Sequence, residues 1–295
     1  MKRLRALCAG LVLAAGAASA NAAPAPAPTA SGYRFQIVTG DDSSLTVRIA
    51  EDLYKRLVPT FAAFRTELAQ RRRLVLVAIG PVALREAAAR RCDCVVIAAF
   101  TSSQVWRSVV DALPPARVKS MTAVYAEPAP SDQVRLAALL YRRPVRVAAI
   151  LGPDTAFLLP ALAGQADVLQ AGLEDNMGDL LSRIGRSEVL LALPDSAIYN
   201  PENIRNILLS TYRRKQAVIG FSADMVKVGA LATTYSEIED INAQVAEMAA
   251  GFVASGELPA PEFPHYFRTA INEGVARSLD IAVTNEARSF ARARP

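Results

Sequence analysis

The chain has 295 residues, of which 52% are hydrophobic and only 6% aromatic, and its formal net charge is +5. This length suits one large or two medium domains. Residues 1–23 hold three basic side chains and no acidic one, so the remaining chain has 30 basic and 28 acidic residues and a net charge of +2. A balance so close to neutral does not demand a nucleic acid or a membrane surface as partner.

The N-terminus has the three parts of a secretory signal peptide. Three of the first five residues are basic, residues 6–15 are apolar, and small residues follow up to Ala23. The apolar run is shorter than the roughly 20 residues that a transmembrane helix needs, although an uncleaved anchor is the alternative. We therefore predict a cleaved signal at residues 1–23, an Ala/Pro-rich spacer at 24–32, and a periplasmic mature protein.

Short apolar runs recur along the rest of the chain, and most do not alternate with polar residues. Such runs are typical of strands that are buried on both faces, and segments of helical character lie between them. The alternation predicts an α/β fold of mostly parallel sheets flanked by helices. The predicted strands are Tyr33–Val38, Leu74–Ile79, Cys94–Phe100, Met121–Tyr125, Val145–Leu151, Val168–Leu169, Val189–Leu193, Ala217–Ile219 and Tyr266–Ile271.

Capping residues indicate where several helices begin. Asn200 offers an N-cap that is followed by a proline and a glutamate. Ser236 and Glu239 form a capping box before a helix of about five turns, which ends near Gly256. The other predicted helices are Leu45–Leu57, Val82–Ala89 and Gln133–Leu140, the last capped by Ser131.

Cys92 and Cys94 are the only cysteines after residue 23, and their spacing puts both on one face of a strand. A disulfide between them would close a very tight ring in an oxidising compartment. The favoured interpretation is that both are small apolar residues that enter the strand, and the disulfide is the alternative. A metal site would need more ligands, and His265 is the single histidine, so we predict no metal site and no cofactor.

Small or polar residues follow the carboxyl ends of the predicted strands. Ligands bind outside these ends in open α/β sheets, and helix N-termini there favour a carboxylate or another anion. Helix capping is the alternative role for each serine, threonine and aspartate in these loops. The loops are residues 39–44, 80–81, 101–103, 152–155, 194–196 and 222–224.

An ordered set of motifs in the second half carries a resemblance to a known family. The motifs are Val145–Pro153, Val189–Ser196, Ala217–Ser222, Val226–Ala232, Thr233–Ser236 and Ala270–Leu279. This set resembles the ABC-transporter substrate-binding proteins of the tryptophan/tyrosine type, which have the two-lobed type 1 periplasmic binding fold. The similarity covers residues 118–281, whereas residues 33–117 fit the fold with weaker motifs.

The resemblance implies binding rather than catalysis, with a ligand held between the lobes. Asp195 and Ser196 match the family's loop that faces the cleft, and Ser222 and Tyr235 match two further positions at its edge. A carboxylate such as Asp195 would pair with a ligand ammonium, while the two serines would donate to a ligand carboxylate. The complete set of predicted ligand-binding residues is Asp41, Ser44, Thr101, Ser102, Glu127, Asp195, Ser196, Ser222 and Tyr235.

The first-lobe loops that would hold an aromatic ligand are not recognisable in this sequence. We therefore do not predict the family's aromatic amino acid as the ligand of this chain. Trp106 follows one of these loops, and packing of a helix is its favoured role. We expect an amino-acid-like ligand or a small anion, a membrane permease or a membrane sensor as partner, and no nucleic acid.

Proline-rich patches at Glu127–Pro130 and Leu258–Pro264 mark expected crossings between the lobes. The predicted first lobe consists of residues 33–126 and 223–258, and the second of residues 127–222 and 259–285. Residues 286–295 are predicted to form a basic, solvated tail.

These inferences predict a periplasmic solute-binding protein that acts as the receptor of an ABC-type uptake system. The alternative is a periplasmic sensory or regulatory binding module that acts on a membrane sensor without transport. A hydrolase is a third reading, because Ser222, Asp240 and His265 follow the serine–acid–base order of one enzyme class. However, Asp224 replaces the second glycine of the nucleophile elbow, and the sequence contains no nucleotide-binding glycine motif, so we predict no enzymatic activity.

Overall fold

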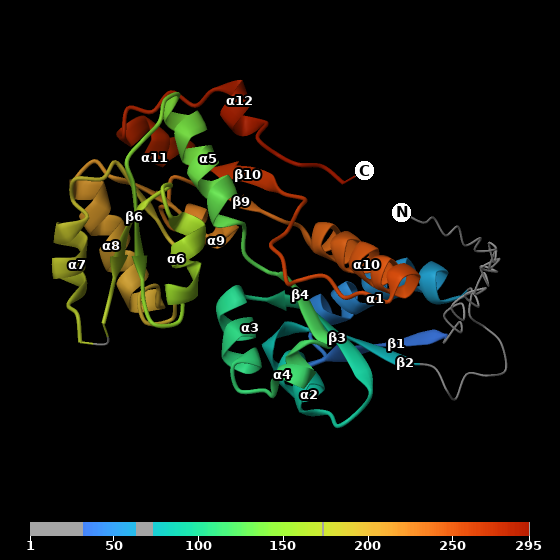
Figure 1. The fold of residues 1–295 in the computed structure, drawn as a ribbon. Helices are drawn as coiled ribbons and strands as arrows, with labels where there is room; N and C mark the ends of the chain where they lie inside the picture. The colour runs from blue at the N-terminus through green and yellow to red at the C-terminus, as the bar shows by residue number, and fades with distance from the viewer. Residues whose placement is uncertain (1–31, 63–72, 173, 295) are drawn as a thin grey trace, which may run out of the picture. The chain divides into compact units, whose positions relative to one another are not determined.

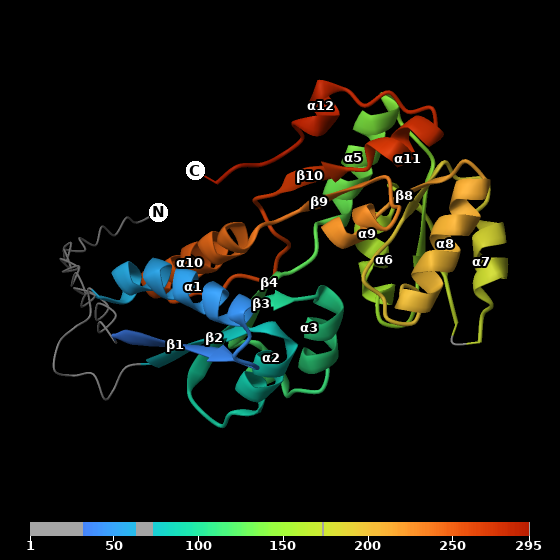
Figure 2. The ribbon, with the colours of Figure 1, turned by 180° about the vertical axis from the view of Figure 1, so that it is seen from behind.

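The computed structural model describes residues 32–62, 73–172 and 174–294. The predicted signal peptide, and the predicted spacer except for Gly32, lie outside the described residues. Two sheets, each with helices on both faces, make up the described part (Figures 1 and 2). Within this part, no helix is both long enough and apolar enough to cross a membrane.

The first sheet contains four parallel strands in the order β1-β2-β3-β4. Its two inner strands are almost entirely buried, as expected for continuous apolar runs that are covered on both faces. We call this sheet and the helices on it the first lobe. Its elements are β1 (Tyr33–Thr39), α1 (Ser44–Ala62), β2 (Arg73–Ile79), α2 (Gly80–Ala89), β3 (Cys94–Thr101), α3 (Ser103–Val110), α4 (Pro115–Val118), β4 (Met121–Tyr125) and α10 (Ile238–Ser255).

The second sheet contains six strands in the order β10-β9-β8-β7-β5-β6, and only β10 runs antiparallel to its neighbour. We call this sheet and its helices the second lobe. Its elements are α5 (Pro130–Tyr141), β5 (Val147–Leu151), a 3₁₀ turn (Ala156–Leu158), α6 (Leu159–Leu162), β6 (Asp167–Gln170), α7 (Met177–Arg183), β7 (Val189–Leu191), α8 (Pro201–Arg213), β8 (Ala217–Ile219), α9 (Ala223–Lys227), β9 (Ala232–Tyr235), β10 (Arg268–Ile271), α11 (Glu273–Ser278) and α12 (Asn285–Arg288).

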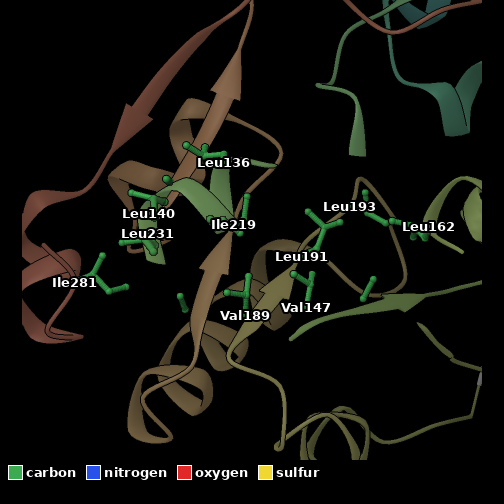
Figure 3. Packing of buried hydrophobic residues seen from close by; sticks show 14 of the residues in the cluster. Leu136, Leu140, Val147, Leu162, Val189, Leu191, Leu193, Ile219, Leu231 and Ile281 are labelled. Atoms are coloured by element: carbon green, nitrogen blue, oxygen red, sulfur yellow. The ribbon is translucent and has the colours of Figure 1, made fainter. Parts of the chain in front are cut away.

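A core cluster fills the space between α5 and one face of the second sheet (Figure 3). Leu136 and Leu140 of α5 pack with Val189 of β7 and Ile219 of β8, and all four side chains are almost completely buried. Each buried aliphatic side chain contributes about 1.5–3 kcal/mol relative to an exposed one. This burial fixes α5, which follows the crossing from the first lobe, firmly on the second sheet.

The predicted strands are confirmed within a few residues, and Ala217–Ile219 matches as predicted. The N-cap at Asn200 is also confirmed, because its side chain accepts from the backbone N–H of Asn203. The predicted cap at Ser131 is wrong: Pro130 begins α5, and Ala129 occupies the cap position.

The capping box of α10 is shifted by one residue from its predicted position. Glu237 is the cap, and the carboxylate of Asp240 accepts from the backbone N–H of Glu237 at 3.1 Å. The predicted cap, Ser236, instead donates its hydroxyl to the carbonyl of Tyr266 at 2.6 Å. The helix ends at Gly256 in the left-handed conformation, as predicted.

The chain passes between the two sheets at residues 126–129, 236–237 and 256–267. The segment 223–235 lies with the second sheet, although it was predicted in the first lobe. The physical reason is that β9 pairs with β8 and β10 of the second sheet. The apolar pattern of this short strand is too weak to predict that pairing. The other lobe boundaries stay predictions.

The helices α1 and α2 lie on opposite faces of the first sheet. Leu53 and Leu57 of α1 pack on the face of Val75, whereas Leu84 of α2 packs on the face of Leu76. The helix α1 connects β1 to β2, and α2 connects β2 to β3. Because these three strands lie side by side in chain order, the two connections have opposite hands. One of them therefore departs from the right-handed rule, and β1 lies at the edge of the sheet.

Cys92 and Cys94 form a disulfide, with Cα atoms 5.2 Å apart. The favoured interpretation, that both cysteines are free apolar residues, is therefore wrong. The disulfide, which was the alternative, is present. The sulfur of Cys94 is buried at the start of β3, where Arg117 also donates to its carbonyl at 2.9 Å.

The C-terminal residues do not form the predicted solvated tail. Arg292 exchanges two backbone hydrogen bonds with Phe267, and Phe290 packs against the Phe267 ring. The guanidinium of Arg294 then reaches Asp240 at the start of α10, with Nε 2.9 Å from Oδ1. The C-terminal segment is fixed because Phe290 packs on Phe267 and Arg294 pairs with Asp240. The number of basic residues in the segment does not predict these contacts.

Replacement of Arg294 by alanine tests this anchoring. The Asp240 side chain is only 5% exposed, so loss of its cation leaves a buried carboxylate without a full partner. We expect a loss of about 2 kcal/mol in the free energy of unfolding, since Arg294 itself is one-third exposed and its pair is partly screened. Urea denaturation measures this loss.

Arg288→Ala is the matched control, because Arg288 pairs with Glu273 while both side chains are about half exposed. We expect this control to cost no more than about 0.5 kcal/mol. Equal losses in the two variants would contradict an anchored C-terminus.

Candidate functional site

The two lobes touch directly at Gln104, the second residue of α3. Its Nε2 donates to Asp154 Oδ2 at 2.6 Å and lies 3.4 Å from Ser196 Oγ. Ser196 also donates to the same Asp154 oxygen, at 3.0 Å. Asp154 and Ser196 lie in loops beyond the carboxyl ends of β5 and β7, and Gln104 lies in the first turn of the helix that follows β3. Open α/β sheets bind ligands outside these ends of their strands.

Asp195 is buried, and both oxygens of its carboxylate are occupied. Oδ1 accepts from the backbone N–H groups of Ala197 and Ile198, and Oδ2 accepts from the Thr155 hydroxyl at 2.8 Å. Gly152 lies against this carboxylate so closely that a Cβ atom there would be 2.6 Å from Oδ2. The side chain therefore holds the loop after β7 against the loop after β5.

Glu127 is buried at the crossing from the first to the second lobe, with 5% of the residue exposed. Its Oε1 accepts from the backbone N–H of Ser103 at 2.8 Å. Its Oε2 is also buried, but it has no hydrogen-bond partner within the described residues. Burial raises the pKa of the Glu127 carboxyl, and hydrogen bonds from Ser103 oppose the rise.

A groove of about 530 Å³ begins beside Ser103 and runs along β4. Three aromatic side chains line it: Trp106 from α3, Tyr125 from the end of β4, and Phe157 from the second lobe. Burial, followed by the nearby charge of Glu127, raises the pKa of Tyr125 to about 12. The expected packing role of Trp106 is confirmed, since it belongs to the core of the first lobe while one side lines the groove.

Three of the predicted hydroxyl residues have local partners. Ser102 caps α3 and accepts from the N–H of Val105, and Ser222 caps α9 in the same way, both at 3.3 Å. The buried Thr101 hydroxyl donates to the carbonyl of Ala99 at 3.4 Å. These contacts match the capping role that the sequence analysis left open for the two serines.

Tyr235 is half-buried at the end of β9, where its Cα pairs with that of Arg268 in β10. No hydrogen bond joins its hydroxyl to another described residue. Ser222 and Tyr235 therefore share the second sheet with Asp195, but no direct contact links them to it within the described part.

Asp41 and Ser44 lie away from the other predicted residues. They follow β1, which is separated from β4 by three strand spacings, or about 14 Å. Asp41 accepts from the N–H of Ser43 at 2.8 Å, and the Ser43 hydroxyl is the main cause of its lowered pKa. Asp41 lines a separate groove of about 450 Å³ between β1 and α1.

The three residues of the hydrolase reading are engaged elsewhere. Ser222 caps α9, the Asp240 carboxylate bonds to Arg294, and His265 Nε2 lies 3.4 Å from a carboxylate oxygen of Glu262. Among the described residues, no hydrogen bond joins any two of the three.

Sequence reasoning missed Gln104, Asp154, Thr155 and Gln133. Asp154 and Thr155 lie in a loop that was identified, and Gln104 directly follows another, so loop position was the available signal. Gln133 gave no signal, yet it is buried in α5, donates to the carbonyl of Gly220 at 2.8 Å, and accepts from the N–H of Thr234 at 2.9 Å. It fixes the first turn of α5 to β9.

The chain matches no protein-family model and no curated protein sequence. It is similar to several solved structures. A ligand-free, open substrate-binding protein with adhesive properties from Clostridium difficile aligns at TM-score 0.57 and 12% identity, over 89% of this chain and 100% of that one. An ABC domain in complex with L-Trp from Streptococcus pneumoniae aligns at TM-score 0.53 and 14% identity, over 88% and 99%.

Identities this low establish the fold and leave the ligand open. Both alignments cover nearly nine-tenths of this chain and almost the whole of the neighbour, so they include both lobes. The chain has the predicted α/β, two-lobed type 1 periplasmic binding fold, in which each lobe is a mostly parallel sheet flanked by helices.

Proposed function

We propose that this chain is a periplasmic solute-binding protein that holds a small ligand between its lobes, as the receptor of an ABC-type uptake system. The observation that carries the proposal is the buried Oε2 of Glu127, which has no partner in the described part although it lies where the lobes meet. An unsatisfied buried carboxylate costs about 1–3 kcal/mol, so a folded chain keeps it at a cost that a bound ligand would offset.

A ligand ammonium is the group that best complements Glu127. Such a group would donate charge-assisted hydrogen bonds to Oε2, and these are roughly twice as strong as neutral ones. Because the Asp195 carboxylate is already fully bonded, we assign the cation-binding role to Glu127 instead. We keep Ser196 in the site, since its hydroxyl, Gln104 and Asp154 already form the contact between the lobes.

The aromatic groove beside Ser103 suits an apolar part of the same ligand. Trp106, Tyr125 and Phe157 offer ring faces and edges there, and the backbone N–H of Ser103 connects the groove to Glu127. We therefore propose a small amine or amino acid with an apolar side group. The neighbouring structure in complex with L-Trp supports this ligand class without fixing its identity.

Thermal unfolding with a panel of amino acids, amines and small anions tests the binding function. A ligand at 100 times its dissociation constant stabilises the folded state by about 2.7 kcal/mol. For a chain of this size, we expect the midpoint to rise by about 5–10 °C with at least one amine-bearing compound. If every amine-bearing compound leaves the midpoint unchanged, the proposal is wrong.

The substitution Glu127→Gln separates the binding role of this residue from its structural one. An amide keeps the acceptor for the Ser103 N–H and replaces the unpaired oxygen with a neutral NH₂ group. We expect a gain of about 1 kcal/mol in the free energy of unfolding at pH 7, together with at least a tenfold loss of affinity for the amine-bearing ligand. Titration calorimetry and urea denaturation measure the two effects.

The difference in stability between wild type and Glu127→Gln should depend on pH. Because burial raises the pKa of Glu127 in the folded state, its protonated form stabilises the fold at low pH. Wild-type stability should therefore fall, relative to the variant, as pH rises above the ordinary carboxyl pKa of 4.5. If the difference in the free energy of unfolding between wild type and variant is equal at pH 4 and pH 7, the buried Glu127 carboxyl does not ionise in this range and the expectation is wrong.

A further inference from the structure

A concentration of basic side chains lies at the amino ends of β5, β7 and β8, opposite the ligand-binding ends of these strands. Three turns, 142–146, 183–188 and 213–216, lead into the strands and contain eight basic residues and one acidic one. We call these turns the basic end. The basic residues are Arg142, Arg143, Arg146, Arg183, Arg186, Arg213, Arg214 and Lys215, and all eight are exposed.

Hydrogen bonds hold the three turns beside one another. The N–H of Glu188 donates to the carbonyl of Arg146 at 2.8 Å, and the N–H of Ala217 donates to the carbonyl of Glu188 at 3.0 Å. Gln216 Nε2 also bonds to the carbonyls of Ile184 and Ser187. Figures 1 and 2 both show α7 beside α8, whose C-terminal ends enter two of the turns. The basic end is therefore one continuous surface.

Most of this positive charge is not neutralised by acidic side chains of the described residues. Glu188 bonds to Arg143 and lies 4.0 Å from Arg146, and Asp280 lies 3.6 Å from Lys215. The Arg143 guanidinium lowers the pKa of Glu188 to about 2, so this one carboxylate is fully charged and fully engaged. Side-chain hydrogen bonds and ion pairs of the basic end are confined to Arg143, Arg146, Arg214 and Lys215. The other four side chains have no such contact with any described residue. They are Arg142, Arg183, Arg186 and Arg213.

The backbone gives an independent reason to regard this charge as functional. Arg142 and Lys215 adopt left-handed conformations, with φ of 57° and 56°. A glycine is the usual residue at such positions because it has no Cβ to clash. The chain keeps a basic side chain at two positions of the same surface where a glycine would relax the backbone.

Two large apolar side chains adjoin the basic end. Tyr212 and Leu209 of α8 are 51% and 49% exposed, and they lie three residues apart on the same side of the helix. Basic side chains flanked by exposed tyrosine and leucine are typical of surfaces that bind the headgroup region of a membrane. A hollow of about 380 Å³, lined by Arg146, Arg183 and Arg186 and by the single acidic residue Asp167, is large enough for a phosphate group.

We propose that the basic end binds the surface of an anionic phospholipid membrane. This contact goes beyond the proposed ligand binding, because it uses the opposite ends of the strands. Side chains that no neighbour holds in place suit a fluid lipid surface, whereas an acidic protein partner would have to order each of them at an entropic cost. The small overall charge of the chain does not oppose the contact, because the charge is concentrated on one end.

Flotation with lipid vesicles tests the proposal. The wild-type protein should bind vesicles of equal parts phosphatidylglycerol and phosphatidylcholine in 50 mM salt, and bind far less in 300 mM salt or to phosphatidylcholine alone. The triple variant Arg183→Gln, Arg186→Gln, Arg213→Gln should bind about 100-fold more weakly, at about fivefold per arginine. All variants carry the same residues 1–31, so any contribution from that segment is common to them.

The matched control removes the same charge from the first lobe, as Arg34→Gln, Arg85→Gln, Arg91→Gln, since these arginines are also exposed. Its vesicle binding should stay within twofold of wild type. An equal loss in the control would show that total charge decides, and would overturn the proposal. Absence of wild-type binding to the anionic vesicles would also overturn it, and would favour an acidic protein partner.

Arg142→Gly separates lipid binding from folding. Glycine relieves the left-handed backbone, so the unfolding temperature should be unchanged or higher. Binding to the anionic vesicles should nevertheless fall about fivefold. Unchanged binding in this variant, together with unchanged binding in the triple variant, would exclude the basic end as the membrane contact.

Discussion

The burial of the inner strands on both faces is the constraint on which the rest of the structure depends. A strand such as Ala217–Ile219 has no face left for polar side chains, so helices must cover both sides of each sheet. Polar groups are then restricted to the two ends of the strands. The carboxyl ends of the strands lead mostly into helix N-termini, and the amino ends follow helix C-termini. The two ends of one sheet thus acquire different chemistry from the same topology.

At the carboxyl ends, the structure distinguishes polar groups that the fold uses from those that it leaves free. Asp195 is the more obvious ligand residue by sequence, but its carboxylate is consumed by Thr155 and the turn that it caps. Glu127 has one oxygen without a described partner, although it is equally buried. A buried group without a partner costs stability, and therefore needs another reason to be present. We therefore place the proposed cation site at Glu127 rather than at Asp195.

Much of the fold could be predicted from the sequence, because apolar runs and caps are local signals. The strand at Met121–Tyr125 and the cap at Asn200 needed no knowledge of neighbours. The location of Asp41 could not be predicted in the same way. Chain order does not reveal that β1 lies at the sheet edge, about 14 Å from β4, so the distance of this loop from the other predicted loops became known only from the structure. Gln133 was missed because its partners are about 100 residues away.

Net charge was misleading because it is an average over the whole surface. Cations are favoured at helix C-termini by the helix dipole, which accounts for residues such as Arg183 and Arg213 in the last turns of α7 and α8. This effect fades within one turn. The dipole also favours a cation at Arg142, the C-cap residue of α5, and near Lys215, but it does not favour the left-handed backbone that a glycine would relax at each turn. An anionic surface that faces this end of the lobe would give a basic side chain at these two positions a use that a glycine cannot supply.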